Sequence, residues 1–216
     1  MTAVLSPPKT RSDSVVTLPG ISWETYESLL TDLSDRSVPH LTYDRGTLII
    51  MSPTAEHERY NRAIARLVEV LTEEFEVEML GLGSTTFRRK EVNRGFEPDS
   101  CFYIQNERLV RGKKRLDLSV DPPPDLIIEI DITSPSLDRF PIFARFGVPE
   151  VWRFDGERLE IFKLSGEAYE RSERSEALPF VDADALAAFV KESFTLGSLE
   201  WVRKVREWAR GRKGAE

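Results

Sequence analysis

Cysteine is nearly absent from this chain, because Cys101 is the only one among 216 residues. A single cysteine excludes an internal disulfide framework. Since Cys101 lies in an apolar segment, we expect a small buried hydrophobic residue there rather than a nucleophile. The sequence also has no internal repeat and no low-complexity tract. With 40% hydrophobic residues, the chain suits one domain with a substantial core.

Long apolar runs and an excess of positive charge are missing as well. No run reaches the roughly 18 apolar residues that span a membrane. Residues 1–18 are rich in Ser, Thr and Pro and lack the apolar core of a signal peptide. We therefore expect a cytoplasmic protein with no membrane partner. The net charge of −7 disfavours proteins that coat nucleic acid indiscriminately, because that mode needs broad phosphate neutralisation.

Several local basic segments remain despite the acidic balance. Such segments are more often solvated surface than a binding patch. If the chain binds DNA, we expect a few contacts near Arg88, Arg89, Lys113 and Lys114, and a shallow salt dependence. The full set of candidates is Arg88-Arg89-Lys90, Arg94, Arg111, Lys113-Lys114-Arg115, Arg203, Lys204, Arg206, Arg210, Arg212 and Lys213.

Helical and strand periodicities alternate along the chain and predict an α/β (α+β) fold. We expect a single domain over residues 19–210, between a flexible arm over 1–18 and a flexible tail over 211–216. Ser22 predicts a helix N-cap, and Pro141 fits only the first turn of its helix. The expected helices are 23–33, 55–75, 136–146, 183–191 and 199–210, and the expected strands and hairpins are 41–51, 77–82, 85–89, 95–104, 125–132 and 151–164.

Two of the expected strands place carboxylates among apolar residues. Glu129 and Asp131 alternate with isoleucines, so a period of two puts both carboxylates on one face. Charges in apolar strands are costly unless they meet a partner or a metal. With Asp99 from a neighbouring strand, three carboxylates could converge. Hard oxygen ligands suit Mg²⁺ or Mn²⁺, and a metal held in this way commonly acts on phosphodiesters.

An alternative interpretation needs no metal. Arg139 follows the second acidic strand, and an ion pair between Arg139 and these carboxylates would fix the sheet. Mn²⁺ titration separates the two interpretations, because a structural ion-pair cluster should not bind the metal.

Six short motifs occur in an order that resembles one family. They resemble the Uma family of bacterial proteins, long classed as a domain of unknown function and assigned to the restriction endonucleases of the PD-(D/E)xK nuclease superfamily. The resemblance covers nearly the whole chain from Ile21. Its motifs are Ser22-Trp23-Glu24-Thr25-Tyr26, Met51-Ser52-Pro53, Glu56-His57-Glu58, Glu97-Pro98-Asp99, Pro123-Pro124-Asp125-Leu126-Ile127-Ile128-Glu129 and Gly147-Val148-Pro149-Glu150-Val151-Trp152.

This resemblance implies a restriction-endonuclease-like core, with a mixed β-sheet flanked by helices. An N-terminal helix, a β-hairpin and C-terminal helices would be added to that core. The resemblance further implies that Asp99, Glu129 and the carbonyl of Ile130 hold the metal. It also implies a lysine two residues after the glutamate, where this chain has Asp131.

The basic group expected from the family shifts to the next helix, where the matching residue is Arg139. Arginine can stabilise a crowded phosphate, but a pKa above 12 makes it a poor general base. Water activation would then fall to the metal, Glu129 or Asp131. The resemblance also places His57 at the edge of the site, although His57 could equally cap its helix or fill a gap.

We therefore expect a Mg²⁺- or Mn²⁺-dependent endonuclease that acts on double-stranded DNA, as a homodimer because two sites related by a dyad can cut two strands. One alternative is a catalytically degraded module that binds DNA or a protein partner. Another is a toxin-like or transposon-associated partner protein. A fold alone does not decide among these functions.

Overall fold

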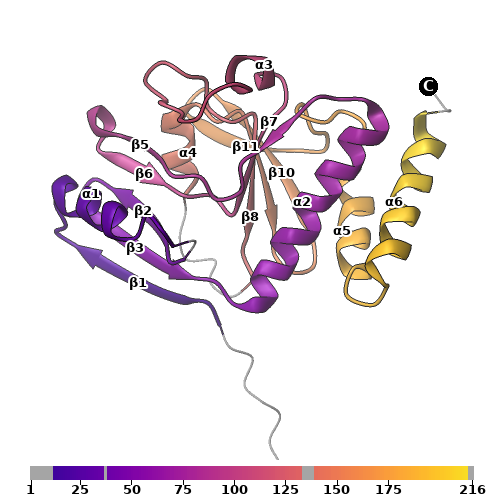
Figure 1. The fold of residues 1–216 in the computed structure, drawn as a ribbon, viewed down its shortest axis with the longest axis horizontal. Coiled ribbons are helices and arrows are strands. Elements are labelled where there is room, and N and C mark those ends of the chain that lie inside the picture. The colour runs from indigo at the N-terminus through magenta and orange to yellow at the C-terminus, as the bar shows by residue number, and fades with distance from the viewer. Residues whose placement is uncertain (1–11, 37, 133–138, 214–216) are drawn as a thin grey trace, which may run out of the picture.

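The computed structural model describes residues 12–36, 38–132 and 139–213. Within these ranges the chain forms two β-sheets and a layer of helices (Figure 1). Of the described helices, none combines the length and apolar character required to cross a bilayer. The helices are α1 (Trp23–Asp32), α2 (Ala55–Phe75), α3 (Glu107–Val110), α4 (Phe140–Phe146), α5 (Ala183–Glu192) and α6 (Ser198–Lys213), with a 3₁₀ turn η1 at Lys90–Val92.

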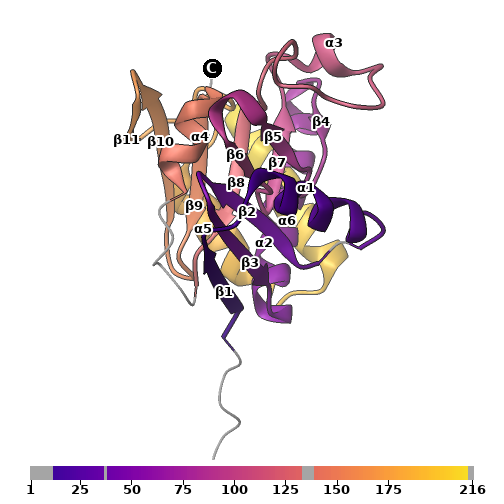
Figure 2. The same ribbon diagram turned by 90° about the vertical axis from the view of Figure 1, so that its left-hand side faces the viewer.

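The first sheet, sheet A, is antiparallel throughout, and α1 lies against it (Figure 2). Ser22 caps α1, because its side chain accepts a hydrogen bond from the backbone N–H of Thr25. Tyr26 of α1 stacks on Tyr43 with ring centroids 4.9 Å apart. In spatial order the strands of sheet A are β1 (Ser14–Pro19), β3 (Thr47–Ser52), β2 (His40–Asp44), β6 (Arg94–Phe96) and β5 (Phe87–Arg89).

The second sheet, sheet B, is mixed. Its one parallel pair among the described strands is β8–β9, and α4 lies between these two strands in the sequence. This is the crossover that parallel neighbours require. In spatial order the strands are β11 (Ala168–Ser172), β10 (Leu159–Ser165), β9 (Glu150–Phe154), β8 (Leu126–Ile130), β7 (Ser100–Tyr103) and β4 (Leu80–Gly81).

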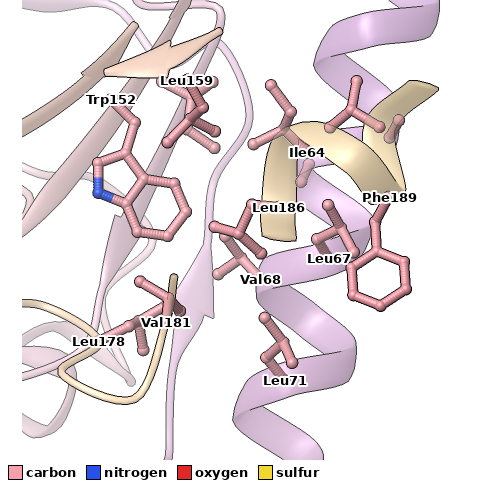
Figure 3. Packing of buried hydrophobic residues seen from close by; sticks show 14 of the residues in the cluster. Ile64, Leu67, Val68, Leu71, Trp152, Leu159, Leu178, Val181, Leu186 and Phe189 are labelled. Carbon is pink, nitrogen blue, oxygen red and sulfur yellow. The ribbon is translucent and has the colours of Figure 1, made fainter. Parts of the chain in front are cut away.

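The main core lies between sheet B and the layer formed by α2, α5 and α6 (Figure 3). One side of α2 presents Ile64, Leu67, Val68 and Leu71, all fully buried, toward Trp152 of β9. Burying each such side chain contributes roughly 1.5–3 kcal/mol. A second core covers the opposite face of sheet B, where α4 packs near β5 and β6. Sheet B is therefore covered on both faces.

The architecture confirms the expected α/β fold of a mixed sheet flanked by helices, with an added N-terminal helix and hairpin. The long helix begins and ends where its apolar periodicity predicts, at Ala55 and Phe75. Of the helix expected over 136–146, residues 140–146 are helical and 136–138 lie outside the described residues. Cys101 is fully buried, and burial raises the pKa of its thiol to about 12.

The N-terminal boundary differs from the expected arm over residues 1–18. Ser14–Pro19 is the edge strand of sheet A and pairs with β3 from Ser14↔Ser52 to Pro19↔Thr47. The overall Ser, Thr and Pro content of the segment concealed the strand-forming run Val15-Val16-Thr17. At the other end α6 continues to Lys213 rather than Arg210.

Candidate active site

Asp99 lies where the chain passes from sheet A to sheet B, between β6 and β7. Its side chain is buried, and Oδ2 accepts a hydrogen bond from the backbone N–H of Ile130 at 2.7 Å. Its carbonyl accepts a hydrogen bond from Asn61 of α2 at 2.9 Å, and Asn61 in turn accepts one from Ser100 at 2.7 Å. Sheet B and α2 therefore fix the position of Asp99.

Glu129 belongs to β8, and the predicted alternation of that strand is present. Ile128 and Ile130 point into the core beneath α2, whereas Ile127 belongs to the core on the opposite face. Glu129 shares the face of Ile127 and is 4% exposed. Asp131 follows the end of β8 and pairs with Arg153 of β9, Oδ2 to Nε at 3.0 Å.

Arg139 is the N-cap residue of α4, and its guanidinium contacts the carboxylate of Glu129. The contact is not aligned as a hydrogen bond, and neither carboxylate oxygen of Glu129 has a hydrogen-bond partner within the described part of the chain. Arg94 secures the start of α4 from sheet A, because its guanidinium bonds Asp44 and the carbonyl of Pro141, each at 2.8 Å.

His57 lies in the first turn of α2, where Thr54 is the N-cap and accepts its backbone N–H at 3.2 Å. The imidazole is fully buried between two carboxylates. Nδ1 lies 3.1 Å from Oδ2 of Asp13, and Nε2 lies 3.1 Å from Oδ1 of Asp99. The second contact has the distance of an ion pair but lacks hydrogen-bond alignment. His57 thus lies against Asp99 itself.

Residues 23–195 match the model of the Uma2 family, described as "Putative restriction endonuclease". The chain belongs to this family. A solved structure from Anabaena variabilis ATCC 29413, described as "a putative nuclease belonging to DUF820", is similar with a TM-score of 0.47 and 16% sequence identity. The similarity covers 76% of this chain and 92% of that chain. No curated protein matches the chain.

The two carboxylates of this Uma2 site differ in proton affinity. Burial raises the pKa of Glu129 to about 8, against the opposing charge of Arg139. Burial also disfavours the Asp99 anion, but the adjacent His57 outweighs it and holds the pKa of Asp99 below its ordinary value. Burial opposes the His57 cation too, yet Asp99 and then Asp13 raise the pKa of His57 to about 9. A proton at this pair of carboxylates therefore favours Glu129 over Asp99.

The donor set of this Uma2 site fits a hard divalent cation. Among the described residues, neither buried oxygen of Glu129 has a hydrogen-bond partner, and the charge of Asp99 acts on the Glu129 carboxyl. Carboxylates are ligands that Mg²⁺ and Mn²⁺ accept. No group of three or more His, Cys, Asp or Glu side chains within the described ranges is arranged around a metal position. Asp131, expected as a third carboxylate, is paired with Arg153 instead.

The basic segments are largely engaged within the protein. Arg89 donates to the carbonyl of Arg145 at 2.8 Å, Arg88 lies 3.8 Å from Glu27, and Lys113 pairs with Asp121. At the C-terminus, Arg206 and Arg210 pair with Glu73 and Glu74 of α2. These pairs reduce the positive charge that each segment offers to a phosphate backbone.

Sequence reasoning missed Asn61, Arg153 and Asp13. Asn61 follows His57 by four residues, so helical spacing alone could have placed both on one face of α2. Arg153 depends on the register of β8 and β9, in which it faces Glu129. Asp13 precedes His57 by 44 residues and carries no local signal that could have identified it.

Proposed function

We propose that this Uma2 family member is a divalent-metal-dependent endonuclease that hydrolyses phosphodiester bonds in double-stranded DNA. Asp99, Glu129 and the carbonyl of Ile130 would hold Mg²⁺ or Mn²⁺. When bound, the metal would polarise the scissile phosphate and lower the pKa of an attacking water. The observation that carries the proposal is the buried Glu129 carboxylate, whose oxygens have no hydrogen-bond partner among the described residues and whose pKa the charge of Asp99 helps to raise.

The residues around the carboxylates supply orientation and charge. The N–H of Ile130 and the ring of His57 hold one oxygen of Asp99 each, which fixes the direction of this carboxylate. Arg139 already neutralises Glu129, and its side chain is 14% exposed. On transfer to a phosphate, its planar guanidinium would stabilise the charge that develops in the transition state.

Asp131 stands where the superfamily has its lysine, and its side chain is 20% exposed beside Arg153. An aspartate can accept a proton from water, whereas neither arginine can. We therefore propose Asp131 or Glu129 as the proton acceptor of the chain. The homodimer and the cytoplasmic location stay predictions from the sequence.

Cleavage and metal binding test the proposal together. We expect the wild-type protein to nick supercoiled plasmid with Mg²⁺ or Mn²⁺ and to bind Mn²⁺ in calorimetry. Asp99→Asn should abolish both, because it removes the anionic ligand while retaining an acceptor for the Ile130 N–H. Asp35→Asn, on the exposed surface, is the matched control. An Asp99→Asn variant that binds Mn²⁺ as tightly as the wild-type protein would overturn the ligand assignment.

The second candidate function is a module that binds DNA or protein without cutting. This function is favoured because Asp131 stands in place of the superfamily lysine and is paired with Arg153. Fluorescence anisotropy of a labelled duplex separates the two functions. The nuclease should bind more tightly with Ca²⁺ than with EDTA, because the cation screens the site carboxylates from phosphates. The DNA-binding module should show equal affinity in both, and a protein-binding module should show no DNA affinity.

A further inference from the structure

Asp13 connects the N-terminal edge of sheet A to the active site. It directly precedes β1, and its side chain is 5% exposed. Oδ1 accepts the backbone N–H of Thr54 at 2.7 Å, at the N-cap of α2. Oδ2 lies 3.1 Å from Nδ1 of His57. One carboxylate thus binds both the start of the helix and the imidazole in its first turn.

The imidazole of His57 has a carboxylate at each nitrogen. Asp13 is at Nδ1 and Asp99 is at Nε2, each at 3.1 Å. The partner of one ring nitrogen sets the tautomer and the orientation of the other. A ring held at only one nitrogen could rotate away. With Asp13 in place, Nε2 stays at ion-pair distance from Asp99.

We propose that Asp13 is a positioning residue of the active site, which holds His57 so that Nε2 fixes one oxygen of Asp99. The other oxygen of Asp99 already receives the Ile130 N–H. Asp13 therefore completes the orientation of a carboxylate that it does not touch. Its effect on metal binding and cleavage rests on the proposed function, whereas its effect on the His57 ring does not.

The edge strand β1 begins directly after this residue, so the N-terminal segment belongs to the proposed site. Most residues of β1 are exposed, and β1 is held to sheet A through its pairing with β3. A simpler role for Asp13 would be to extend the helix cap by accepting the Thr54 N–H. That role concerns only helix stability and leaves the ring of His57 unaffected.

Nuclear magnetic resonance of the two histidine rings distinguishes the two roles. The chain contains only His40 and His57, so His40→Gln assigns the spectrum. In Asp13→Ala, we expect the ring ¹⁵N signals of His57 to shift while those of His40 stay in place. Asp13→Asn, which retains an acceptor, should give smaller shifts. The matched control is Ser14→Ala, at the exposed neighbouring position.

Mn²⁺ calorimetry on the same variants gives the second measurement. Loss of an outer-shell partner typically lowers metal affinity by about 10- to 100-fold. We expect this loss in Asp13→Ala, a smaller loss in Asp13→Asn and none in Ser14→Ala. A variant with a lowered Tm but unchanged His57 signals would overturn the proposal and leave Asp13 a helix-cap residue. A wild-type protein without Mn²⁺ binding would instead defeat the proposed function, and the ring signals would still report on Asp13.

Discussion

The charged clusters at the two ends of α2 differ in burial. At the N-terminal end, His57 lies between Asp13 and Asp99, and the side chains of all three are at most 5% exposed. At the C-terminal end, Glu74 accepts hydrogen bonds from both Arg206 and Arg210. The side chain of Arg210 is 66% exposed, and Arg210 and then Arg206 hold the pKa of Glu74 below its usual value.

This difference in burial agrees with the proposed function, which assigns the chemistry to the N-terminal end of the helix. The C-terminal cluster links α6 to α2 through solvent-accessible ion pairs, and such pairs contribute little to stability. Buried charges are expensive, and a neighbouring carboxylate, Glu129, has unmet hydrogen-bonding capacity among the described residues. A fold that retains such a cluster gains something other than stability from it.

The largest effect should follow from Glu129→Gln, which keeps the shape of the side chain and removes its capacity to ionise. Loss of a metal ligand is expected to lower plasmid cleavage by at least about 1000-fold. The Tm should hold or rise, because a buried carboxylate disfavoured by its surroundings is removed. Glu74→Gln, the same substitution at the other end of α2, should cleave like the wild type. If Glu129→Gln cleaved plasmid as fast as the wild type, Glu129 would have no greater role in cleavage than Glu74.

Arg139→Ala tests the positive charge that Glu129 faces. We expect cleavage to fall about 100- to 1000-fold, because the guanidinium would act on the phosphate in the transition state. Mn²⁺ affinity should change little, and Arg139→Lys should retain part of the activity. Single-turnover cleavage at saturating Mn²⁺ provides the comparison. Equal rates for the three proteins would mean that Arg139 serves the fold alone.

Leu67→Ala tests the middle of α2, which joins the two clusters. Leu67 is fully buried in the main core, so truncation should lower the free energy of unfolding by about 2–5 kcal/mol. Urea denaturation measures this loss, with the half-exposed Arg66→Ala as control. The folded fraction should still bind Mn²⁺ with unchanged affinity. A selective loss of Mn²⁺ affinity at full stability would contradict this division of roles.

The smallest effect should follow from Glu74→Gln on stability. Because Arg210 is exposed, Arg206 is partly exposed and both are screened by solvent, we expect the Tm to stay within about 2 °C of the wild type. A thermal melt at low and high salt provides the measurement. A large drop at low salt would show that the C-terminal cluster holds α6 more firmly than surface pairs usually do.

Much of the fold was predictable because its signals are local. The apolar spacing of α2 and the cap at Ser22 depend on residues within a few positions of each other. Strand β1 was not predicted, because it is stabilised by pairing with β3, 28 to 38 residues away in the sequence, and is largely exposed. Its short apolar run has no sequence context that distinguishes it from a loose arm.

The candidate site was predictable to the extent that strand alternation decides it. The alternation of β8 places Glu129 on the face opposite the α2 core, and Arg139 follows closely enough in sequence to be considered. The pairing of Asp131 with Arg153 depends on the register of two parallel strands. Only the assembled sheet determines that register, so the sequence alone predicted a third converging carboxylate.

The passage of the chain between the sheets at Asp99 also has a consequence for the order of folding. The bonds that define the site join residues far apart in sequence, 44 positions for Asp13 and His57 and 31 for Asp99 and Ile130. Long-range contacts form late, because loop closure must be completed before they can stabilise the chain. During refolding, helical signal from α2 should therefore return before Mn²⁺ affinity does. Mn²⁺ binding at the proposed site would thus report whether both sheets have reached their native arrangement.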